Sequence, residues 1–240
     1  MTDYFKRDGV SASLLKTCVK QSAAHAAWRQ ANPMDPTPAM KLGTATHAGV
    51  LQSEEAGDLI AVAPDVDRRT KSGKAEYAEW LEGVGDRLVI TPEQSDLAWA
   101  MTQAVHAHPE ASRLLADCYA TEVEVFRDID GLTCKAKVDA MDDAGTIVDL
   151  KTTTDASPEA FGRQCANLLY HLQLAWYSEV VGVGVGAASA FIIAVENSAP
   201  HAVAVYQLGR DTLDIGSRLC EVGLARWRHH LAAEARTGGG

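Results

Sequence analysis

Two aspartates and a lysine, Asp139, Asp149 and Lys151, lie in two alternating segments that a short polar turn separates. The turn, Asp-Ala-Gly at 143–145, is typical of a three-residue hairpin with its glycine in the left-handed position. This register places Asp139 directly opposite Asp149, and the Cβ atoms of such a pair are only about 5 Å apart. Lys151 follows Asp149 by two residues, so it projects from the same face of the strand.

Two carboxylates that converge with a lysine suit metal-assisted hydrolysis of a phosphodiester. Opposed carboxylates repel each other, and a divalent cation such as Mg²⁺, which prefers oxygen ligands, removes that repulsion. The cation would polarise the phosphate and lower the pKa of a bound water, while the lysine would position that water or help to deprotonate it. Alternating charges are also typical of a solvated sheet face with salt bridges. The apolar neighbours of Asp149 favour the catalytic interpretation, because an unpaired charge in a buried strand is costly.

The segments around this hairpin predict a mixed α/β domain with a central sheet. Near residue 120 the hydrophobic period changes from 3.6 to 2, and three segments form an antiparallel meander: 121–127, 134–141 and 146–152. We expect helices at 11–30, from about Gly43, and at 74–84, 92–118, 158–181 and 211–235, and further strands at 187–195 and 202–208. Residues 1–240 should form a single domain, with a mostly helical part (1–118), a catalytic sheet and helix (119–210) and a C-terminal helix (211–235).

Composition excludes several protein classes. The chain has 240 residues, of which 47% are hydrophobic, and this favours a folded domain over a disordered chain. No apolar run reaches the roughly 18–20 residues of a membrane span, and residues 1–13 lack the apolar core of a signal peptide. The five cysteines are scattered without a C-x-x-C pair, which indicates a reduced cytoplasmic protein rather than a disulfide framework or a zinc ribbon.

The net charge of −10 argues at first sight against a nucleic-acid partner. One segment has the opposite character, since four positive charges lie within seven residues and no acid separates them: Arg68, Arg69, Lys71 and Lys74. We expect the basic loop 64–74 to grip DNA phosphates, although a merely solvated basic loop would have the same composition. The sequence therefore predicts a polarised protein that admits DNA only at a basic, metal-loaded cleft.

Five short motifs, in the same order, make the chain resemble the PD-(D/E)XK nuclease superfamily, and within it the RecE (exonuclease VIII) type of phage and prophage recombination exonucleases. The motifs are Ser11-Ala12-Ser13-Leu14, Gly43-Thr44-Ala45-Thr46-His47, Ala63-Pro64-Asp65 with Arg68-Arg69-Thr70, Asp139 with Asp149-Leu150-Lys151, and Tyr170-His171-x-Gln173 with Tyr177. Where the superfamily name has Pro-Asp, this chain has Val138-Asp139. The resemblance implies a PD-(D/E)XK fold, in which helices flank a mixed sheet.

The resemblance also implies roles for the residues of the site. His47, Asp139 and Asp149 would be metal ligands, and Lys151 would be the catalytic lysine. Gln173 and Tyr177, one helical turn apart, would support the site or contact the DNA backbone, although they could simply pack.

One further acidic ligand is implied on the first core strand. Glu122 matches the family position and would help to bind metal or water. Glu124 shares its strand face and competes for the role, but we expect Glu124 to pair with Lys135 instead. Without the resemblance, His47 could equally be an ordinary histidine on a helix surface.

The activity that the resemblance implies is that of a Mg²⁺-dependent exodeoxyribonuclease, with Mn²⁺ as a substitute. It would degrade one strand of linear double-stranded DNA from 5′ to 3′, in a bacterial or phage-infected cell. The 3′ overhang would serve a single-strand annealing protein, and the chain would form a ring-shaped trimer or tetramer around the DNA. Two alternatives remain open, namely a structure-specific or restriction-type endonuclease of the same fold, and a non-catalytic DNA-binding or assembly subunit.

Overall fold

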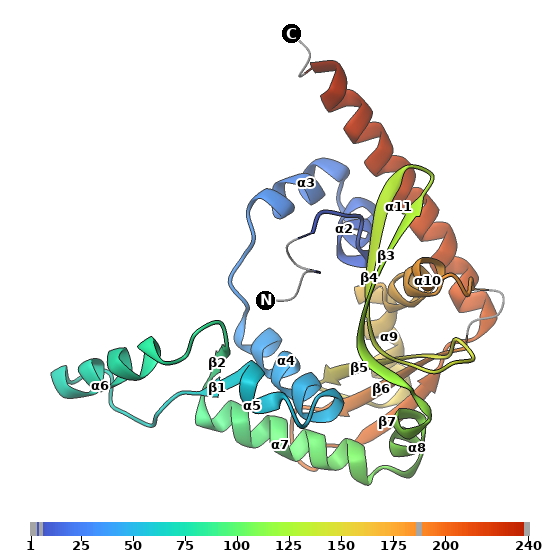
Figure 1. Cartoon of the computed structure of the whole chain (residues 1–240). Coiled ribbons are helices and arrows are strands. Elements are labelled where there is room, and N and C mark those ends of the chain that lie inside the picture. Colours follow the sequence, from blue (N-terminus) through green and yellow to red (C-terminus); the bar gives the residue numbers. More distant parts are fainter. Residues whose placement is uncertain (1–3, 5–6, 186–188, 238–240) are drawn as a thin grey trace.

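A five-stranded mixed sheet with the strand order β3-β4-β5-β6-β7 forms the centre of the protein (Figure 1). The computed structural model describes residues 4, 7–185 and 189–237. The strands are β3 (Ala120–Ile129), β4 (Leu132–Met141), β5 (Ile147–Thr153), β6 (Ala190–Glu196) and β7 (Val203–Gln207). The predicted meander is present as β3, β4 and β5, while β6 runs parallel to β5 and β7 antiparallel to β6. The predicted α/β class is therefore confirmed, although the first residues of the strand predicted at 187–195 lie outside the described residues.

The hairpin between β4 and β5 has the predicted turn and register. Gly145 has a φ of 85°, the left-handed conformation that glycine adopts without steric cost. The ladder pairs Ala140 with Val148 and then stops, while β4 continues beside β3 along its whole length. Asp139 and Asp149 are the next pair in this register, so both aspartates lie where β4 and β5 begin to separate. This fork gives carboxylates from neighbouring strands room to converge.

Side chains from alternate sheet positions belong to two separate apolar clusters. Ile147 and Ile192 belong to the first cluster, whereas Val148 and Ile193 belong to the second. The helices that contribute to the first cluster are α2 (Ala12–Lys20), α3 (Ala23–Ala31), α9 (Pro158–Leu168), α10 (Tyr170–Val181) and α11 (Arg210–Thr237). Those that contribute to the second are α4 (Pro38–Leu51), α7 (Pro92–Ala107) and α8 (Pro109–Asp117). Burial on both faces explains why the β6 segment has a continuous apolar run rather than an alternating one.

Three of the predicted long helices are each interrupted once. The segment 11–30 divides at Ser22, whose hydroxyl accepts a hydrogen bond from the backbone N–H of His25 and caps α3. The segment 92–118 divides at Pro109, which lacks the N–H that a continuing helix needs. The segment 158–181 divides at Leu169, which has a φ of 53°. In each case the apolar period continues across the break, so hydrophobic spacing alone predicts one helix.

A small second sheet does not appear in the sequence predictions. It consists of β1 (Ile60–Val62) after the short helix α5 (Ala56–Leu59), paired in parallel with β2 (Leu88–Ile90). Three residues are too few to show a strand period. In the sequence, α6 (Lys71–Glu82) lies between these two strands, and it extends away from the rest of the molecule (Figure 1).

Two helices begin earlier than predicted. α4 begins at Pro38 rather than near Gly43, and α6 begins at Lys71 rather than at residue 74. In both, a threonine hydroxyl caps the first turn by accepting a backbone N–H. The basic segment that we expected to be a loop is therefore helical from Lys71 onward.

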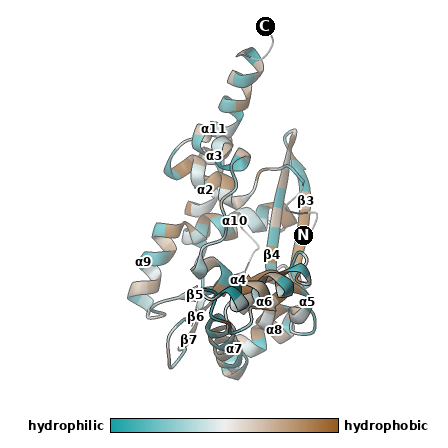
Figure 2. Cartoon of the chain, turned by 90° about the vertical axis from the view of Figure 1, so that its left-hand side faces the viewer, coloured by the Kyte–Doolittle hydropathy of each residue, from teal (hydrophilic) through white to brown (hydrophobic). Residues whose placement is uncertain are grey.

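The hydropathy of the surface differs between elements. Hydrophilic and hydrophobic residues alternate along β3 and β4 (Figure 2), as expected for a ribbon that packs on α10 with one face. The C-terminal end of α11 projects beyond the sheet in both views (Figures 1 and 2). Among the described residues, no helix combines the length and the apolar character that crossing a membrane requires.

Candidate functional site

Three side chains from three different elements converge at the fork between β4 and β5. His47 comes from α4, Glu122 from β3 and Asp139 from β4, and one possible ligand atom of each lies within 4.8 Å of the others. The Nδ1 atom of His47 lies 3.8 Å from Oε1 of Glu122 and 3.6 Å from Oδ2 of Asp139. Their side chains are 24%, 14% and 13% exposed, so the cluster is shielded but can be reached from solvent.

The backbone of Leu150 determines how His47 presents its ring. The Nε2 atom of His47 lies 2.8 Å from the carbonyl oxygen of Leu150, and a carbonyl can only accept, so Nε2 carries the proton. The Nδ1 atom then faces two carboxylates. Because a lone pair and carboxylate oxygens repel each other, a proton or a metal cation at Nδ1 is favoured. Burial would lower the pKa of His47, but Asp139 and Glu122 together raise it. This arrangement matches a metal-binding histidine with a fixed tautomer.

Asp139 is held by the same backbone unit. The N–H of Leu150 donates to Oδ2 of Asp139 at 2.8 Å, across the point where β4 and β5 separate. Burial raises the pKa of Asp139 to about 6, and nearby Asp149 acts in the same direction against the opposing effect of His47. A carboxylate in this environment gains from a bound cation, which removes the cost of burying its charge.

Glu122 reaches the cluster through an unusual backbone conformation. It has a φ of 52° within β3, while its neighbours Thr121 and Val123 remain paired with β4. A non-glycine residue with positive φ is uncommon in a strand and costs conformational energy. Such residues cluster at functional sites, where the backbone conformation directs a side chain toward the site. Burial would raise the pKa of Glu122, but hydrogen bonds with His47 and Lys137 lower it, and its other oxygen forms an ion pair with Lys137.

The two candidate glutamates on β3 have different surroundings. Glu124 accepts the backbone N–H of Tyr4 at 3.2 Å and is not part of the metal-ligand cluster. The predicted pair between Glu124 and Lys135 is wrong, because the Lys135 ammonium donates to the carbonyl oxygens of Tyr4 and Arg7. The N-terminal residues Tyr4 and Arg7 therefore take the place of the expected partners: Tyr4 contacts Glu124, and Tyr4 and Arg7 contact Lys135. The strand pattern of the sequence could not place these residues.

Asp149 and Lys151 form a buried ion pair beside the cluster. Asp149 is fully buried in the centre of β5, and its Oδ2 contacts the Lys151 ammonium. Burial would lower the pKa of Lys151, but Asp149 and Asp139 raise it. The predicted convergence of Asp139, Asp149 and Lys151 is thus present, but Asp149 is not among the three grouped ligand atoms.

A second layer of polar groups from α2 and α10 supports Asp149. The side-chain amide of Gln173 donates to Oδ1 of Asp149 at 3.0 Å and approaches the Tyr177 hydroxyl at the same distance. The ammonium of Lys16 donates to the amide oxygen of Gln173 at 2.6 Å. Sequence analysis missed Lys16, because nothing in its local pattern distinguishes it from a surface lysine of an amphipathic helix. Gln173 and Tyr177 contact the site by the same helix face that their spacing predicts.

None of the four basic residues of the predicted DNA-gripping loop is part of the metal-ligand cluster. Arg68 lies over the ring of Tyr77 at 4.7 Å, and Arg69 forms an ion pair with Asp67. Lys71 and Lys74 are exposed on α6.

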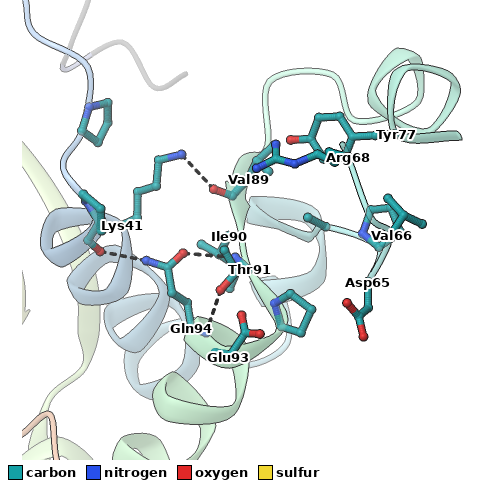
Figure 3. Close-up of a pocket in the computed structure, with 15 residues that line it drawn as sticks. Lys41, Asp65, Val66, Arg68, Tyr77, Val89, Ile90, Thr91, Glu93 and Gln94 are labelled. Atoms are coloured by element: carbon teal, nitrogen blue, oxygen red, sulfur yellow. Dashed lines mark hydrogen bonds between the residues drawn. The ribbon is translucent and has the colours of Figure 1, made fainter. Parts of the chain in front are cut away.

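Arg68 and Tyr77 border a surface hollow of about 610 Å³ (Figure 3). Lys41 lines the same hollow and donates to the carbonyl oxygen of Val89 at 3.1 Å. Lys41 precedes His47 by six residues on α4, which corresponds to about 9 Å along the helix axis. One helix therefore connects the hollow with the metal-ligand cluster.

The donor set fits a divalent cation. Two carboxylates and one imidazole nitrogen provide ligands for Mg²⁺ or Mn²⁺, and the imidazole favours Mn²⁺ in affinity. Asp149 lies beside this set, with Oδ2 on the Lys151 ammonium and Oδ1 accepting from Gln173. No Cys is among the three grouped ligands, so the cluster lacks the thiolates that are common in structural zinc sites.

The sequence matches, over residues 11–237, a family described as a PDDEXK-like domain of unknown function (DUF3799). A crystal structure from Eubacterium rectale, described as that of a "putative exonuclease", is similar with a TM-score of 0.59 and 15% identity, covering 90% of this chain and 81% of that one. At this identity the likeness shows the fold alone. The structure of SSO0001 matches with a TM-score of only 0.32 and 16% identity, over 75% of this chain and 83% of that chain, and supports no conclusion. No curated protein matches the sequence.

Proposed function

Because the chain belongs to the PDDEXK-like family DUF3799, we propose that it is a metal-dependent nuclease that hydrolyses the phosphodiester backbone of DNA. The observation that carries this proposal is the convergence of His47, Glu122 and Asp139 beside the buried pair of Asp149 and Lys151. A buried group of carboxylates, a histidine of fixed tautomer and a lysine is what metal-assisted phosphodiester hydrolysis needs.

In this proposal, His47, Glu122 and Asp139 hold Mg²⁺ or Mn²⁺, and Asp149 completes the ligand set. The bound cation would supply Lewis acidity toward the phosphate and a water of lowered pKa. Leu150 positions the site by donating its N–H to Asp139 and accepting from His47, so the two ligands keep a fixed separation. Such fixed donors cost little reorganisation during the reaction.

Lys151 would act mainly through its charge. Its pKa is raised, so the ammonium stays protonated near neutral pH and can stabilise negative charge on the phosphate. Deprotonating a water would first require Lys151 to lose the proton that Asp149 and Asp139 favour. We therefore assign Lys151 to water positioning and charge balance rather than to the general base.

The finer activity follows from the RecE resemblance. We propose an exonuclease that degrades one strand of linear duplex DNA from 5′ to 3′ and leaves a 3′ overhang for a single-strand annealing protein. A ring-shaped homo-oligomer would retain the duplex between cleavage steps. Arg68, Arg69, Lys71 and Lys74 would hold the DNA backbone near the hollow beside α4, through contacts that carry no base specificity.

The test compares end-labelled linear duplex with closed circular DNA, each incubated with Mg²⁺ or Mn²⁺, with EDTA, and with the Lys151→Ala variant. The exonuclease proposal expects digestion of linear DNA alone, and loss of digestion with EDTA or with Lys151→Ala. Cutting of circular DNA would support the endonuclease alternative. Binding without hydrolysis under every metal condition would support a non-catalytic DNA-binding subunit.

A further inference from the structure

Lys16, on helix α2, contacts Gln173 of α10, one of the polar groups that support Asp149. Its ammonium donates to Oε1 of Gln173 at 2.6 Å, and Gln173 in turn donates to Asp149. Lys16 is partly buried, and its ammonium lies 5.2 Å from the ring centroid of Tyr170. Fixing the Lys16 side chain in one position costs conformational entropy. A ligand that binds its ammonium would therefore find the group already oriented.

The charge partners of Lys16 differ from those of the other site lysines. Lys151 contacts the carboxylate of Asp149, and Lys137 contacts that of Glu122. For Lys16, the structure gives no carboxylate within ion-pair distance in residues 4, 7–185 and 189–237, and its hydrogen-bond partner is a neutral amide. Lys16 therefore has no direct ion pair, and Asp149, whose charge acts on the ammonium, is reached only through Gln173.

The ammonium of Lys16 lies near that of Lys151, the lysine of the candidate site. The ammonium groups of Lys16 and Lys151 each lie 5.2 Å from the centroid of the same Tyr170 ring, so they are no further apart than twice that distance. Burial and the nearby Lys151 lower the pKa of Lys16 to about 8, against the opposing effect of Asp149. Asp149 pairs with Lys151 and offsets only part of the repulsion between the two cations, so a bound anion beside Lys16 would offset the rest.

We propose that Lys16, held by Gln173 and Tyr170, binds the DNA phosphate adjacent to the scissile one. This inference rests on the proposed nuclease function and names a substrate contact of the same site. Gln173 contacts both Lys16 and Asp149, so a phosphate bound at Lys16 would be placed in register with the carboxylates and Lys151. Correct placement of the chain on both sides of the reacting bond lowers the entropic part of the barrier.

The experiment uses duplex substrates that carry a single neutral methylphosphonate at successive positions around the cleavage site. The wild-type protein should lose activity roughly 10–100-fold when the linkage next to the scissile one is neutral. Lys16→Met should lose a similar factor on the fully charged substrate, chiefly through a higher KM, and should be insensitive to the neutral linkage at that position. Lys16→Arg, which keeps the charge, should recover much of the activity.

Lys20 provides a matched control on the same helix. It lies one turn after Lys16, is exposed, and donates to the carbonyl oxygen of Asn167 at 2.7 Å. Lys20→Met should behave like the wild type on every substrate. The inference is overturned if Lys16→Met stays as sensitive as the wild type to the neutral linkage at that position, or if Lys20→Met gives the same loss as Lys16→Met.

Binding in Ca²⁺ separates this inference from the proposed function. Fluorescence anisotropy with the same oligonucleotides should show that Lys16→Met binds the charged duplex more weakly and no longer distinguishes the neutral linkage. If the wild type lacks nuclease activity but this binding pattern is present, only the proposed function fails. If the wild type is an active nuclease and Lys16→Met binds like Lys20→Met, only the inference about Lys16 fails. Thermal unfolding of each variant identifies any loss caused by misfolding.

Discussion

His47 donates from Nε2 to the carbonyl oxygen of Leu150 at 2.8 Å, and this bond leaves Nδ1 facing the carboxylates of Glu122 and Asp139. The same Leu150 residue donates its N–H to Asp139. One peptide segment of β5 therefore orients two of the three candidate ligands, which come from elements that are far apart in the sequence. The side chains of His47 and Asp139, which this segment holds, can be changed without altering its backbone.

Replacing His47 by alanine should weaken Mn²⁺ binding by at least 10-fold, because a nitrogen ligand with a fixed tautomer is lost. Isothermal titration with Mn²⁺ measures the effect directly. The control is His106→Ala, which removes an exposed histidine of α7 and should leave the affinity unchanged. Equal Mn²⁺ affinity in His47→Ala and the wild type would contradict the assigned ligand set.

Asp139→Asn should abolish activity but raise the thermal stability of the metal-free protein. The pKa of Asp139 is raised from 3.8 to about 6 in the folded state, so the ionised form is the one that folding disfavours. The stabilising contribution of the protonated group is complete below about pH 3.8 and is lost as the pH rises through about 6. Thermal unfolding in EDTA between pH 4 and 8 should therefore show a stability loss that Asp139→Asn reduces. A lower melting temperature for Asp139→Asn at pH 7 would argue against this account.

Metal affinity should fall as the pH drops below about 6. Asp139 has a pKa of about 6 and the pKa of His47 is raised, so protons compete with the cation at both ligands. Titrations with Mn²⁺ at pH 5.5, 6.5 and 7.5 should show progressively tighter binding and proton release. An affinity that does not change across this range would mean that these two residues are not ligands.

Lys151→Met should destabilise the protein as well as inactivate it. Asp149 is only 1% exposed at its side chain, and removal of its partner leaves a buried unpaired charge, which costs about 3–5 kcal/mol. The double variant Asp149→Asn with Lys151→Met removes both charges and should recover much of that stability in urea unfolding while staying inactive. Recovery of activity in the double variant would show that neither group takes part in the reaction.

Changing Arg68 and Arg69 to alanine should weaken DNA binding and reduce its dependence on salt. Each lost phosphate contact should lower the slope of log K against log[salt] by about 1. Arg113→Ala is the matched control, because Arg113 is an exposed arginine of α8 that pairs with Asp117. Unchanged binding in the double variant would mean that the basic segment before α6 is only solvated.

Local chemistry made part of the fold and of the site predictable. The turn at 143–145 and the alternation of its flanking segments depend on residues near one another in sequence, so the sequence alone placed Asp139 opposite Asp149 and directed Lys151 to the same face. The apolar neighbours of Asp149 likewise indicated that its strand is buried. Helix interruptions at Ser22 and Leu169 were missed because the apolar period continues across them.

Other features depended on groups that meet only after folding. The resemblance suggested His47, but its tautomer depends on the carbonyl of Leu150, which lies 103 residues away in sequence. The resemblance favoured Glu122 over Glu124, but the positive φ with which Glu122 reaches His47 is a feature that strand parity cannot reveal. Lys16 reaches Gln173 only because α2 packs against α10. Short-range patterns therefore determined the register of the hairpin, whereas tertiary packing decided which buried charges face one another, because that depends on the distances between elements.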